Sequence, residues 1–391
     1  MRYLFKIALF SILLYLTLDV LIRGDVKGAR PIVQAVGGLS VLLVSWYNLR
    51  NIHKTYAMHK IWSFVKLWRI FVVILVVYYL LTFLEIPSSI YNNSPRNIII
   101  AIYIFSVVLF FYYGTINQHL TKGLLNLVLL IVLFNGLFEI YFAFLYARIK
   151  QGVEVINTSA GYMFVMILPI LLYRFKKDNI WMFIITLILT MLTGKRGALL
   201  IYLVFLLYGF VNLKWIRKSF KLNWKIVLFL GVIIVGYIFF METSFESLQY
   251  RLLNIENTDR GSIGSGRNIL WTLFLSKWYF SDSLVNLFFG YGFYATMGFN
   301  GFMAHNDFVE FLFDFGLLGL FCYVFVLISY YKNIKWVKLM NPYLYMLLMF
   351  CLIIWLGRAF VAGTIRTDNI VLSMSLGYLF GITTIQRSKY V

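Results

Sequence analysis

The sequence predicts an all-α polytopic membrane protein with about twelve transmembrane helices. The 391 residues are 62% hydrophobic and only 13% charged, with a mean hydropathy of +0.84, a composition that soluble domains of this size do not have. The apolar residues form repeated stretches close to the roughly 20 residues that cross about 30 Å of hydrocarbon. The basic residues gather in alternate loops, which sets the orientation of the predicted helices.

The apolar stretches give the elements in chain order. The first stretch lacks a small-residue cleavage site and further spans follow it, so we interpret it as a helix and not as a signal peptide. The seventh and eighth helices are separated only by Gly194, Lys195 and Arg196, which predicts a tight turn. The predicted helices lie at 3–22, 31–48, 70–86, 97–114, 124–146, 159–173, 180–193, 197–213, 226–241, 307–330, 343–361 and 369–384.

The charge distribution predicts that both termini are cytoplasmic. With that orientation the cytoplasmic segments hold 21 of the 35 lysines and arginines but only one of the fifteen acids, Asp178. The net charge of +20 is therefore the positive-inside signal of a membrane protein. We expect no nucleic-acid partner, because the excess charge needs no such explanation.

A long segment at 242–306 is the only large non-cytoplasmic loop in the predicted topology. Two of its stretches, "SLQYRLLNI" and "NILWTLFLSKWYF", predict short amphipathic helices on the outer membrane surface. Between them "TDRGSIGSGR" is rich in glycine and serine and predicts a turn. We expect residues 1–391 to form a single integral membrane domain that carries this loop.

Several kinds of site are excluded by the residues that are missing. The two cysteines, Cys322 and Cys351, lie in apolar runs and provide neither a disulfide framework nor a metal site. The sequence has no P-loop, GxGxxG, HExxH, GxSxG or Asp-x-Asp signature. We therefore expect no metal and no cofactor.

Charged residues inside the predicted spans are costly and are candidates for function. Asp19, Glu85, Glu139, Asp314 and Arg358 all fall in the outer halves of their helices. Asp314 and Arg358 lie at similar depth in neighbouring helices, and we interpret them as a structural ion pair. The other charged candidates lie nearby, so any reaction is expected at the outer face of the membrane.

A polar cluster precedes the tenth predicted helix. Asp307 as N-cap and Glu310 three residues later would form a capping box, although both acids could instead serve a reaction. His305 stands just before the cap and is the only histidine outside the cytoplasmic loops. Its imidazole suits proton transfer near neutral pH, and a structural role for a lone interfacial histidine is the alternative.

Basic residues form the second candidate set on the outer side. Arginine binds phosphate with a planar fork of donors, and several arginines could hold a diphosphate. Anchoring to anionic lipid head groups is the alternative for each of them. The candidate diphosphate-binding residues are Lys195, Arg196, Arg251, Arg260 and Arg267.

Three stretches resemble the O-antigen polymerase and ligase family of bacterial surface-polysaccharide assembly. "TGKRGALL" (193–200) resembles the Thr/Ser-x-Arg-Gly-Ala turn of that family. "GSGRNILW" (264–271) resembles its Ser-Gly-Arg-x-x-x-Trp segment, followed by the glycine-rich "LFFGYGFY" (287–294). "HNDFVEFLFDFGLLGL" (305–320) resembles its His-Asn-led helix with Gly-x-x-Gly. The resemblance covers roughly residues 160–340, and the first five helices resemble nothing specific.

The resemblance implies an inverting, metal-independent glycosyltransferase of the GT-C-like type in the bacterial inner membrane. Its site would face the periplasm, take a glycan on undecaprenyl diphosphate and transfer it to a sugar hydroxyl. Arg196, Arg267 and His305 match the functional residues of the family, whereas Lys195, Arg251, Arg260 and Glu310 are our additions. Glu310 would orient the imidazole if the fold brings it close. Membrane lipids, a chain-length regulator and a flippase are the other expected partners.

Four functions are considered, and the polymerase is our prediction. A polymerase elongates a lipid-linked repeat unit, and the runner-up, a ligase, moves polymer onto lipid A core. The third is a transporter of lipid-linked oligosaccharide. Transporters usually have repeated halves, and the sequence shows no such repeat, which argues against this function. The fourth is a scaffold for an assembly complex. His305 could act as a general base or could only position the acceptor.

Overall fold

The computed structural model describes residues 1–23, 30–54, 62–84, 95–149, 159–175, 179–193, 195–212, 267–363 and 369–388. Every helix that the sequence predicts within these residues is present. The predicted helix at 226–241 lies outside the described residues, as do Arg251, Arg260 and the stretch "SLQYRLLNI".

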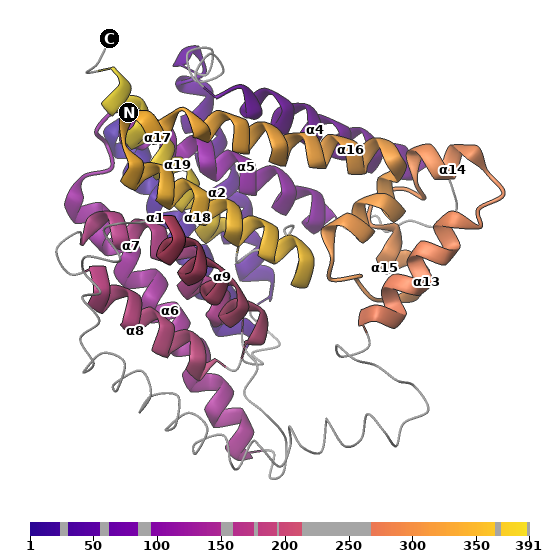
Figure 1. The fold of residues 1–391 in the computed structure, drawn as a ribbon, viewed down its shortest axis with the longest axis horizontal. Coiled ribbons are helices and arrows are strands. Elements are labelled where there is room, and N and C mark those ends of the chain that lie inside the picture. The colour runs from indigo at the N-terminus through magenta and orange to yellow at the C-terminus, as the bar shows by residue number, and fades with distance from the viewer. Residues whose placement is uncertain are drawn as a thin grey trace.

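The described elements are all helices, with no strand among the residues just given (Figure 1). Eight of these helices are long and apolar enough to cross a membrane. Helical spans suit a bilayer because they satisfy their backbone hydrogen bonds internally. The elements are α1 Arg2–Arg23, α2 Arg30–Arg50, α4 Ser63–Leu81, η1 Thr82–Leu84, α5 Pro95–Ile116, α6 Lys122–Ile149, α7 Ala160–Arg174, α8 Asn179–Leu192, α9 Arg196–Asn212, α13 Arg267–Tyr279, α14 Leu284–Phe289, α15 Ala295–Asn300, α16 Asp307–Lys335, α17 Val337–Met340, α18 Pro342–Val361 and α19 Asn369–Arg387.

The observed helix bounds differ from the predicted ones by a few residues, and the differences at α4 and α16 have a physical reason. α4 begins at Ser63, seven residues before the predicted start, because the helix continues through Lys66 and Arg69. Hydropathy marks the part of a helix that lies in hydrocarbon and does not mark the polar turns before it. α16 extends to Lys335 and contains a break at Gly316 that the apolar pattern does not indicate.

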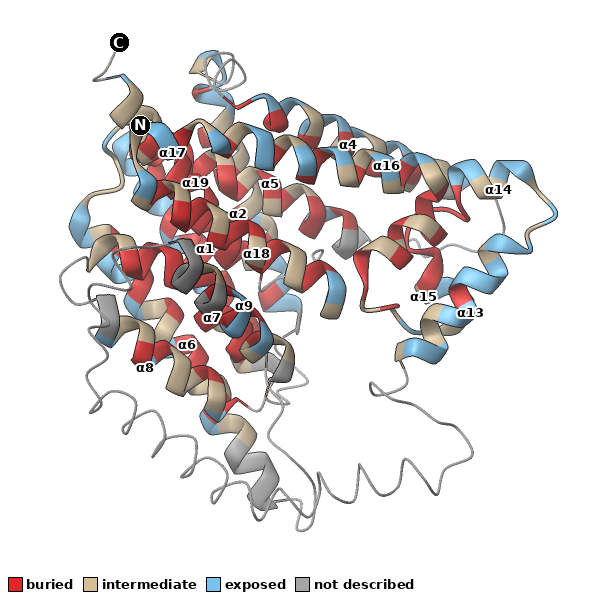
Figure 2. Ribbon diagram, viewed as in Figure 1, coloured by how far each residue is buried: buried red, intermediate tan, exposed pale blue. Residues whose placement is uncertain are grey.

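The centre of the bundle is built from α5, α7 and α19, which carry long runs of buried residues (Figure 2). α5 and α19 lie close together at two glycines of α19. A Cβ atom on Gly377 would lie 2.3 Å from the carbonyl oxygen of Val108, and one on Gly381 would lie 2.6 Å from Cβ of Thr115. This small-xxx-small spacing lets helix backbones approach inside a membrane.

The outward faces of the peripheral helices carry large apolar side chains. Leu42 of α2, Val73 of α4 and Phe325 of α16 are among those exposed. Such faces are unfavourable in water but suit contact with lipid tails. The distribution agrees with a membrane-embedded chain.

The short helices α13, α14 and α15 lie beyond one end of the bundle, and both chain termini lie toward the other (Figure 1). α13 coincides with the predicted amphipathic stretch "NILWTLFLSKWYF". It buries Phe274 and packs against α16, whose first residues also lie at this end. Arg267, which begins α13, and the polar residues at the start of α16 therefore lie at the same end of the molecule.

His119, in the turn between α5 and α6, gives a prediction about acid stability. Its Nδ1 atom lies 2.8 Å from the hydroxyl oxygen of Tyr47. Burial lowers the pKa of His119 below its usual value, and the positive charges of the N-terminus, Lys54 and Arg2 lower that pKa further. As the pH falls below about 6.5, the unfolded chain therefore binds a proton that the folded chain does not, and stability is lost.

We expect His119→Gln to lose less stability than the parent protein between about pH 8 and about pH 5.5. The measurement is the midpoint of thermal unfolding in detergent at the two pH values. The same change at His53, an exposed residue after α2, serves as the control and should leave the acid sensitivity unchanged. Equal acid sensitivity of the His119 variant and the parent would contradict the prediction.

Candidate functional site

The C-terminal end of α18 is the meeting point of two motif stretches. Nη1 of Arg267, the first residue of α13, donates a hydrogen bond of 2.7 Å to the carbonyl oxygen of Val361. Gly197, in the first turn of α9, packs against the same residue, since a Cβ atom there would lie 3.0 Å from Cγ2 of Val361. The stretches 193–200 and 264–271, far apart in the sequence, thus converge on one helix end.

Tyr162, in the first turn of α7, lies beside two cationic side chains at this place. The guanidinium carbon of Arg358 is 4.3 Å from the centre of the Tyr162 ring, and Nζ of Lys195 is 5.9 Å from it. Both distances are within the range of cation–π attraction. Gly197 allows the contact between α7 and α9, because a Cβ atom on it would lie 2.3 Å from the Tyr162 hydroxyl oxygen.

The candidate basic residues are therefore partly assembled. Lys195, Arg267 and the backbone of Arg196, which begins α9, lie around Tyr162 and Val361. The side chain of Arg196 and the whole of Arg251 and Arg260 lie outside the described residues. The described part of the cluster suits an anion, since it combines cations with the starts of helices.

The beginning of α16 differs by one residue from the predicted cap. Asn306 is the N-cap, with extended backbone angles, and its side chain accepts hydrogen bonds from the N–H groups of Phe308 and Val309. The assignment of Asp307 as N-cap is wrong, because Asp307 is already the first helical residue. Both residue types cap helices well, so the sequence alone does not choose between them.

His305 lies just outside α16 with a left-handed backbone, at φ 56°. Glu310 reaches back to it, since Oε1 of Glu310 accepts a hydrogen bond of 2.9 Å from the backbone N–H of His305. The two catalytic candidates, His305 for proton transfer and Glu310 for orienting it, are therefore close. The contact shown is with the backbone of His305, so an orienting role of Glu310 on the imidazole stays a prediction.

Contacts on both sides fix the position of the segment that carries His305. Nε1 of Trp271 in α13 donates to the carbonyl oxygen of Ala304 at 2.7 Å. The ring of Phe308 lies 4.8 Å from the ring of Phe360 at the end of α18. The third motif stretch, 305–320, thus reaches the same helix end as the other two.

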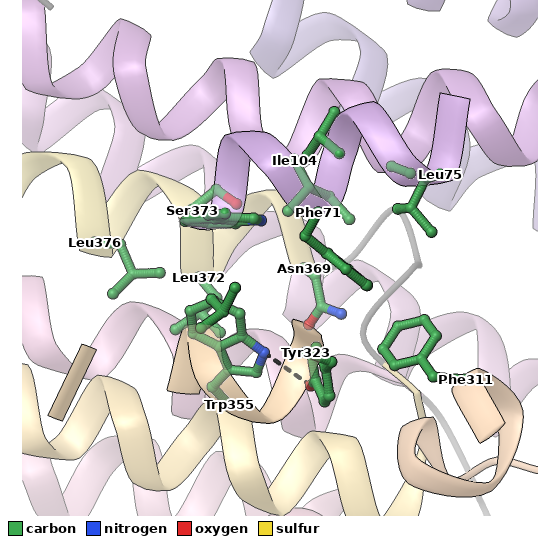
Figure 3. Close-up of a pocket in the computed structure, with 14 residues that line it drawn as sticks. Phe71, Leu75, Ile104, Phe311, Tyr323, Trp355, Asn369, Leu372, Ser373 and Leu376 are labelled. Atoms are coloured by element: carbon green, nitrogen blue, oxygen red, sulfur yellow. Dashed lines mark hydrogen bonds between the residues drawn. The ribbon is translucent and has the colours of Figure 1, made fainter. Parts of the chain in front are cut away.

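A hydrogen bond between Asp307 and Tyr323 joins two parts of α16 that are 16 residues apart in the chain. The hydroxyl of Tyr323 donates to Oδ2 of Asp307 at 2.8 Å, and Nε1 of Trp355 donates to the Tyr323 hydroxyl at 3.1 Å (Figure 3). Sixteen residues of straight helix would span about 24 Å. α16 therefore turns back at Gly316, where φ is 63° and ψ is −162°.

Asp314 and Arg358 have different contacts. Oδ1 of Asp314 accepts a hydrogen bond of 2.9 Å from the N–H of Thr296, in the first turn of α15. Arg358 stacks on Tyr162, as described above. The ion pair between Asp314 and Arg358 that the sequence predicts is not among these contacts, although both residues are described. Asp314 instead holds the outer loop against α16, since a carboxylate binds well at a helix start.

The glycine-rich stretch 287–294 docks onto the break in α16. The N–H groups of Tyr291 and Gly292 donate to the carbonyl oxygens of Phe313 and Asp314, both at 2.9 Å. These carbonyls lie just before the break, where the regular helical pattern of bonds is interrupted. The glycine stretch thus completes the turn of α16.

Two hollows adjoin this site. One is a groove between α9 and α18, directly beside Val361, and its lining is apolar throughout. The other is an internal pocket between α4, α5, α16, α18 and α19, into which Tyr323, Asn369 and Ser373 bring polar atoms (Figure 3). The groove is lined by Gly197, Leu200, Ile201, Val204, Ile353, Leu356, Gly357, Phe360 and Val361.

The sequence did not indicate Tyr162, Tyr323 or the carbonyl of Val361 as parts of the site. The two tyrosines stand in apolar runs that contain many aromatic residues, so no spacing distinguishes them. Within the described part of the chain, no group of three or more His, Cys, Asp or Glu side chains gathers as metal ligands would.

A scan against protein-family models finds no match to this chain, and a search of the curated proteins also finds none. The likeness to the O-antigen polymerase and ligase family therefore rests on the three motif stretches. Their convergence in space is an observation that was not used to recognise them.

The Asp307–Tyr323 contact predicts a cost for removing one hydroxyl group. Tyr323→Phe should lower the free energy of unfolding by about 1–3 kcal/mol, because both residues are buried and the acceptor is a carboxylate. Thermal unfolding in detergent measures this effect. Tyr330→Phe is the matched control, since the Tyr330 hydroxyl is also buried but donates to a neutral acceptor, the carbonyl oxygen of Leu348. A Tyr323 variant no less stable than the control would contradict the prediction.

Proposed function

We propose that this chain is a surface-polysaccharide polymerase of the bacterial inner membrane. It would transfer a glycan from undecaprenyl diphosphate onto a sugar hydroxyl of a lipid-linked repeat unit, at the periplasmic face. The observation that carries the proposal is the meeting of three motif stretches at the end of α18. Arg267 contacts Val361, Gly197 packs against Val361, and Phe308 contacts Phe360.

The surroundings of that helix end suit a lipid diphosphate. Cationic groups at Lys195 and Arg267 favour a diphosphate, and the starts of α9 and α13 add partial positive charge. The apolar groove between α9 and α18 begins at the same residues and suits an apolar chain. A ligand with a charged head and a long hydrocarbon tail fits both features together.

The reaction would need few groups from the protein. The acceptor hydroxyl attacks the anomeric carbon on the face opposite the diphosphate, and a new glycosidic bond forms as the carbon–oxygen bond to the diphosphate breaks. The proton of the hydroxyl passes to His305. The cations stabilise the negative charge that develops on the departing lipid diphosphate.

Purified protein in liposomes with a lipid-linked repeat unit tests this function. We expect lipid-linked glycans of increasing length, seen as a ladder on a gel. Movement of the substrate across the bilayer without elongation would support a transporter instead. An unchanged substrate would contradict the proposal.

The surface polysaccharide of a deletion strain separates polymerase from ligase. Loss of the long ladder, with a single repeat still attached to lipid A core, is the result expected for a polymerase. Polymer left on the lipid carrier, with nothing attached to the core, would identify a ligase and overturn the polymerase proposal.

A further inference from the structure

The junction of α13 and α14 carries a group of exposed apolar side chains beyond the end of the bundle (Figure 1). Phe280 is 77% exposed and Leu284 is 72% exposed. Large contiguous apolar patches are unfavourable in water and mark surfaces that contact something else. We call this group the loop tip, and it consists of Tyr279, Phe280, Leu284, Val285, Phe288 and Phe289.

The loop tip is held in place by contacts on its inner side. The ring of Phe274 in α13 lies 5.1 Å from the ring of Phe313 in α16. Nε1 of Trp278 donates a hydrogen bond of 3.2 Å to the carbonyl oxygen of Leu287, which joins α13 to α14. The exposed side chains are therefore carried outward on a supported pair of helices.

The break in α16 gives the depth of the loop tip. The backbone of Phe288 lies against Gly316, since a Cβ atom on Gly316 would lie 2.4 Å from the carbonyl carbon of Phe288. After Gly316 the helix continues to Lys335, a length of about 28 Å at 1.5 Å per residue. The hydrocarbon of a membrane is about 30 Å thick. With Lys335 at one boundary of the hydrocarbon, Gly316 and Phe288 lie near the other.

The surfaces next to the loop tip are apolar and suit lipid. Phe321, just after the break in α16, and Phe83, just after α4, are both exposed. The ring of Tyr79 lies 5.4 Å from the ring of Phe83 and 5.4 Å from the ring of Phe293, which follows α14. The loop tip thus continues the outward faces of two membrane-spanning helices.

The residue types of the loop tip also suit a lipid surface. Asp282 is the only charged residue from Tyr279 to Phe289, and it lies in the turn between the two helices. Tyr279 combines an aromatic ring with a hydroxyl group, as is common where hydrocarbon meets head groups. At this depth the surrounding molecules are lipids, so we take lipid and not a partner protein as the occupant.

We propose that the loop tip inserts into the adjacent membrane leaflet and anchors the segment from α13 to α15 there. The sequence predicts that α13 itself lies on the membrane surface. In the structure the apolar side of α13, with Trp271 and Phe274, packs against α16, so the lipid contact passes to the loop tip. The inference goes beyond the proposed function and does not depend on it.

The anchor would hold two candidate residues at the membrane surface. Arg267 begins α13, the helix that leads into the loop tip. Trp271 of the same helix donates to the carbonyl oxygen of Ala304, the residue before His305. Insertion of the loop tip therefore sets the height of both residues above the hydrocarbon.

A spin label on the loop tip tests its contact with lipid. A single cysteine is introduced as Leu284→Cys or Phe288→Cys in a chain with Cys322→Ala and Cys351→Ala, and the protein is placed in nanodiscs of phosphatidylethanolamine and phosphatidylglycerol. Molecular oxygen concentrates in hydrocarbon, whereas a charged nickel chelate stays in water. We expect frequent collisions of both labels with oxygen and few with nickel.

Two labelled positions elsewhere are the controls. Val73→Cys lies on the exposed apolar face of α4, and His53→Cys lies at an exposed position after α2. The loop tip should resemble Val73. Nickel access equal to that at His53 would place the loop tip in water and overturn the proposal. Low access of both reagents would mean that protein covers the loop tip, and that result would overturn it too.

The unmodified protein provides a second measurement that needs no cysteine substitution. The probe is a phosphatidylcholine with a photoreactive diazirine in its acyl chain, mixed into the same nanodiscs. After illumination, we expect mass spectrometry to find lipid adducts within residues 279–289. Adducts on α2 and α4 with none in 279–289 would overturn the proposal.

Discussion

Replacing His305 with asparagine is expected to abolish the long polysaccharide ladder while a single repeat unit still reaches the cell surface. General acid–base catalysis contributes about 10²- to 10⁴-fold to the rate of a reaction. A loss of that size would leave too little elongation to form a ladder. The measurement is a gel of surface polysaccharide from a deletion strain that carries the variant.

Asparagine is chosen because of the backbone of His305. The residue has φ 56°, and asparagine adopts this left-handed conformation more readily than alanine does. The variant therefore removes the imidazole with little strain. His53→Ala, at an exposed position after α2, is the control and should keep the full ladder.

The pH dependence of elongation distinguishes a base from a positioning residue. If the imidazole accepts the proton, the rate of the parent protein should fall on the acid side as His305 becomes protonated. Residual activity of His305→Asn should lack that fall. An intact ladder from the variant would remove His305 from the mechanism, while Arg267 and the groove would remain a candidate lipid site.

Most of the fold could be predicted because membrane spans are defined by composition. The expected ranges 97–114, 343–361 and 369–384 lie within α5, α18 and α19 and miss only a few residues at their ends. The start of α4 was missed because its first two turns contain Lys66 and Arg69, which hydropathy excludes from a span. The break in α16 was missed because glycines in apolar runs commonly serve only helix packing.

The candidate site was predictable in its residues more than in its contacts. Charge and motif spacing gave Lys195, Arg267, His305 and Glu310 as candidates, and their role stays a prediction. Lys195 lies beside Tyr162, Arg267 contacts Val361, and Glu310 contacts the backbone of His305. The stacking of Arg358 on Tyr162 was not predictable, because an aromatic ring carries no charge pattern that a sequence shows. The predicted depth in the membrane is similar for Arg358 and Asp314. Which side chains face each other also depends on how the helices are oriented and on the outer loop, which the sequence does not show.

Gly316→Ala is expected to be the most damaging single substitution at this end of the molecule. The backbone there has φ 63° and ψ −162°, a combination that only glycine adopts without strain. A Cβ atom would also lie 2.4 Å from the carbonyl carbon of Phe288 and 2.6 Å from the backbone nitrogen of Gly290. These neighbours are backbone atoms, so no side chain can rotate to make room.

The expected loss is about 3 kcal/mol or more of unfolding free energy, since strain and overpacking act together. Thermal unfolding in detergent and the yield of folded protein measure it. Gly301→Ala is the matched control: Gly301 also has positive φ, at 70°, but a Cβ atom there would meet nothing within 4 Å. The control should lose only about 1 kcal/mol.

The comparison of these two glycines tests how the site is held together. The backbone of Gly290 to Gly292 lies against the break in α16 and binds the carbonyls of Phe313 and Asp314. A Cβ atom at Gly316 would separate these segments, and the part of α16 that follows His305 would lose its support. We therefore expect Gly316→Ala to lose the polysaccharide ladder together with stability. Equal behaviour of the two variants would mean that the docking of 287–294 onto α16 does not position the site.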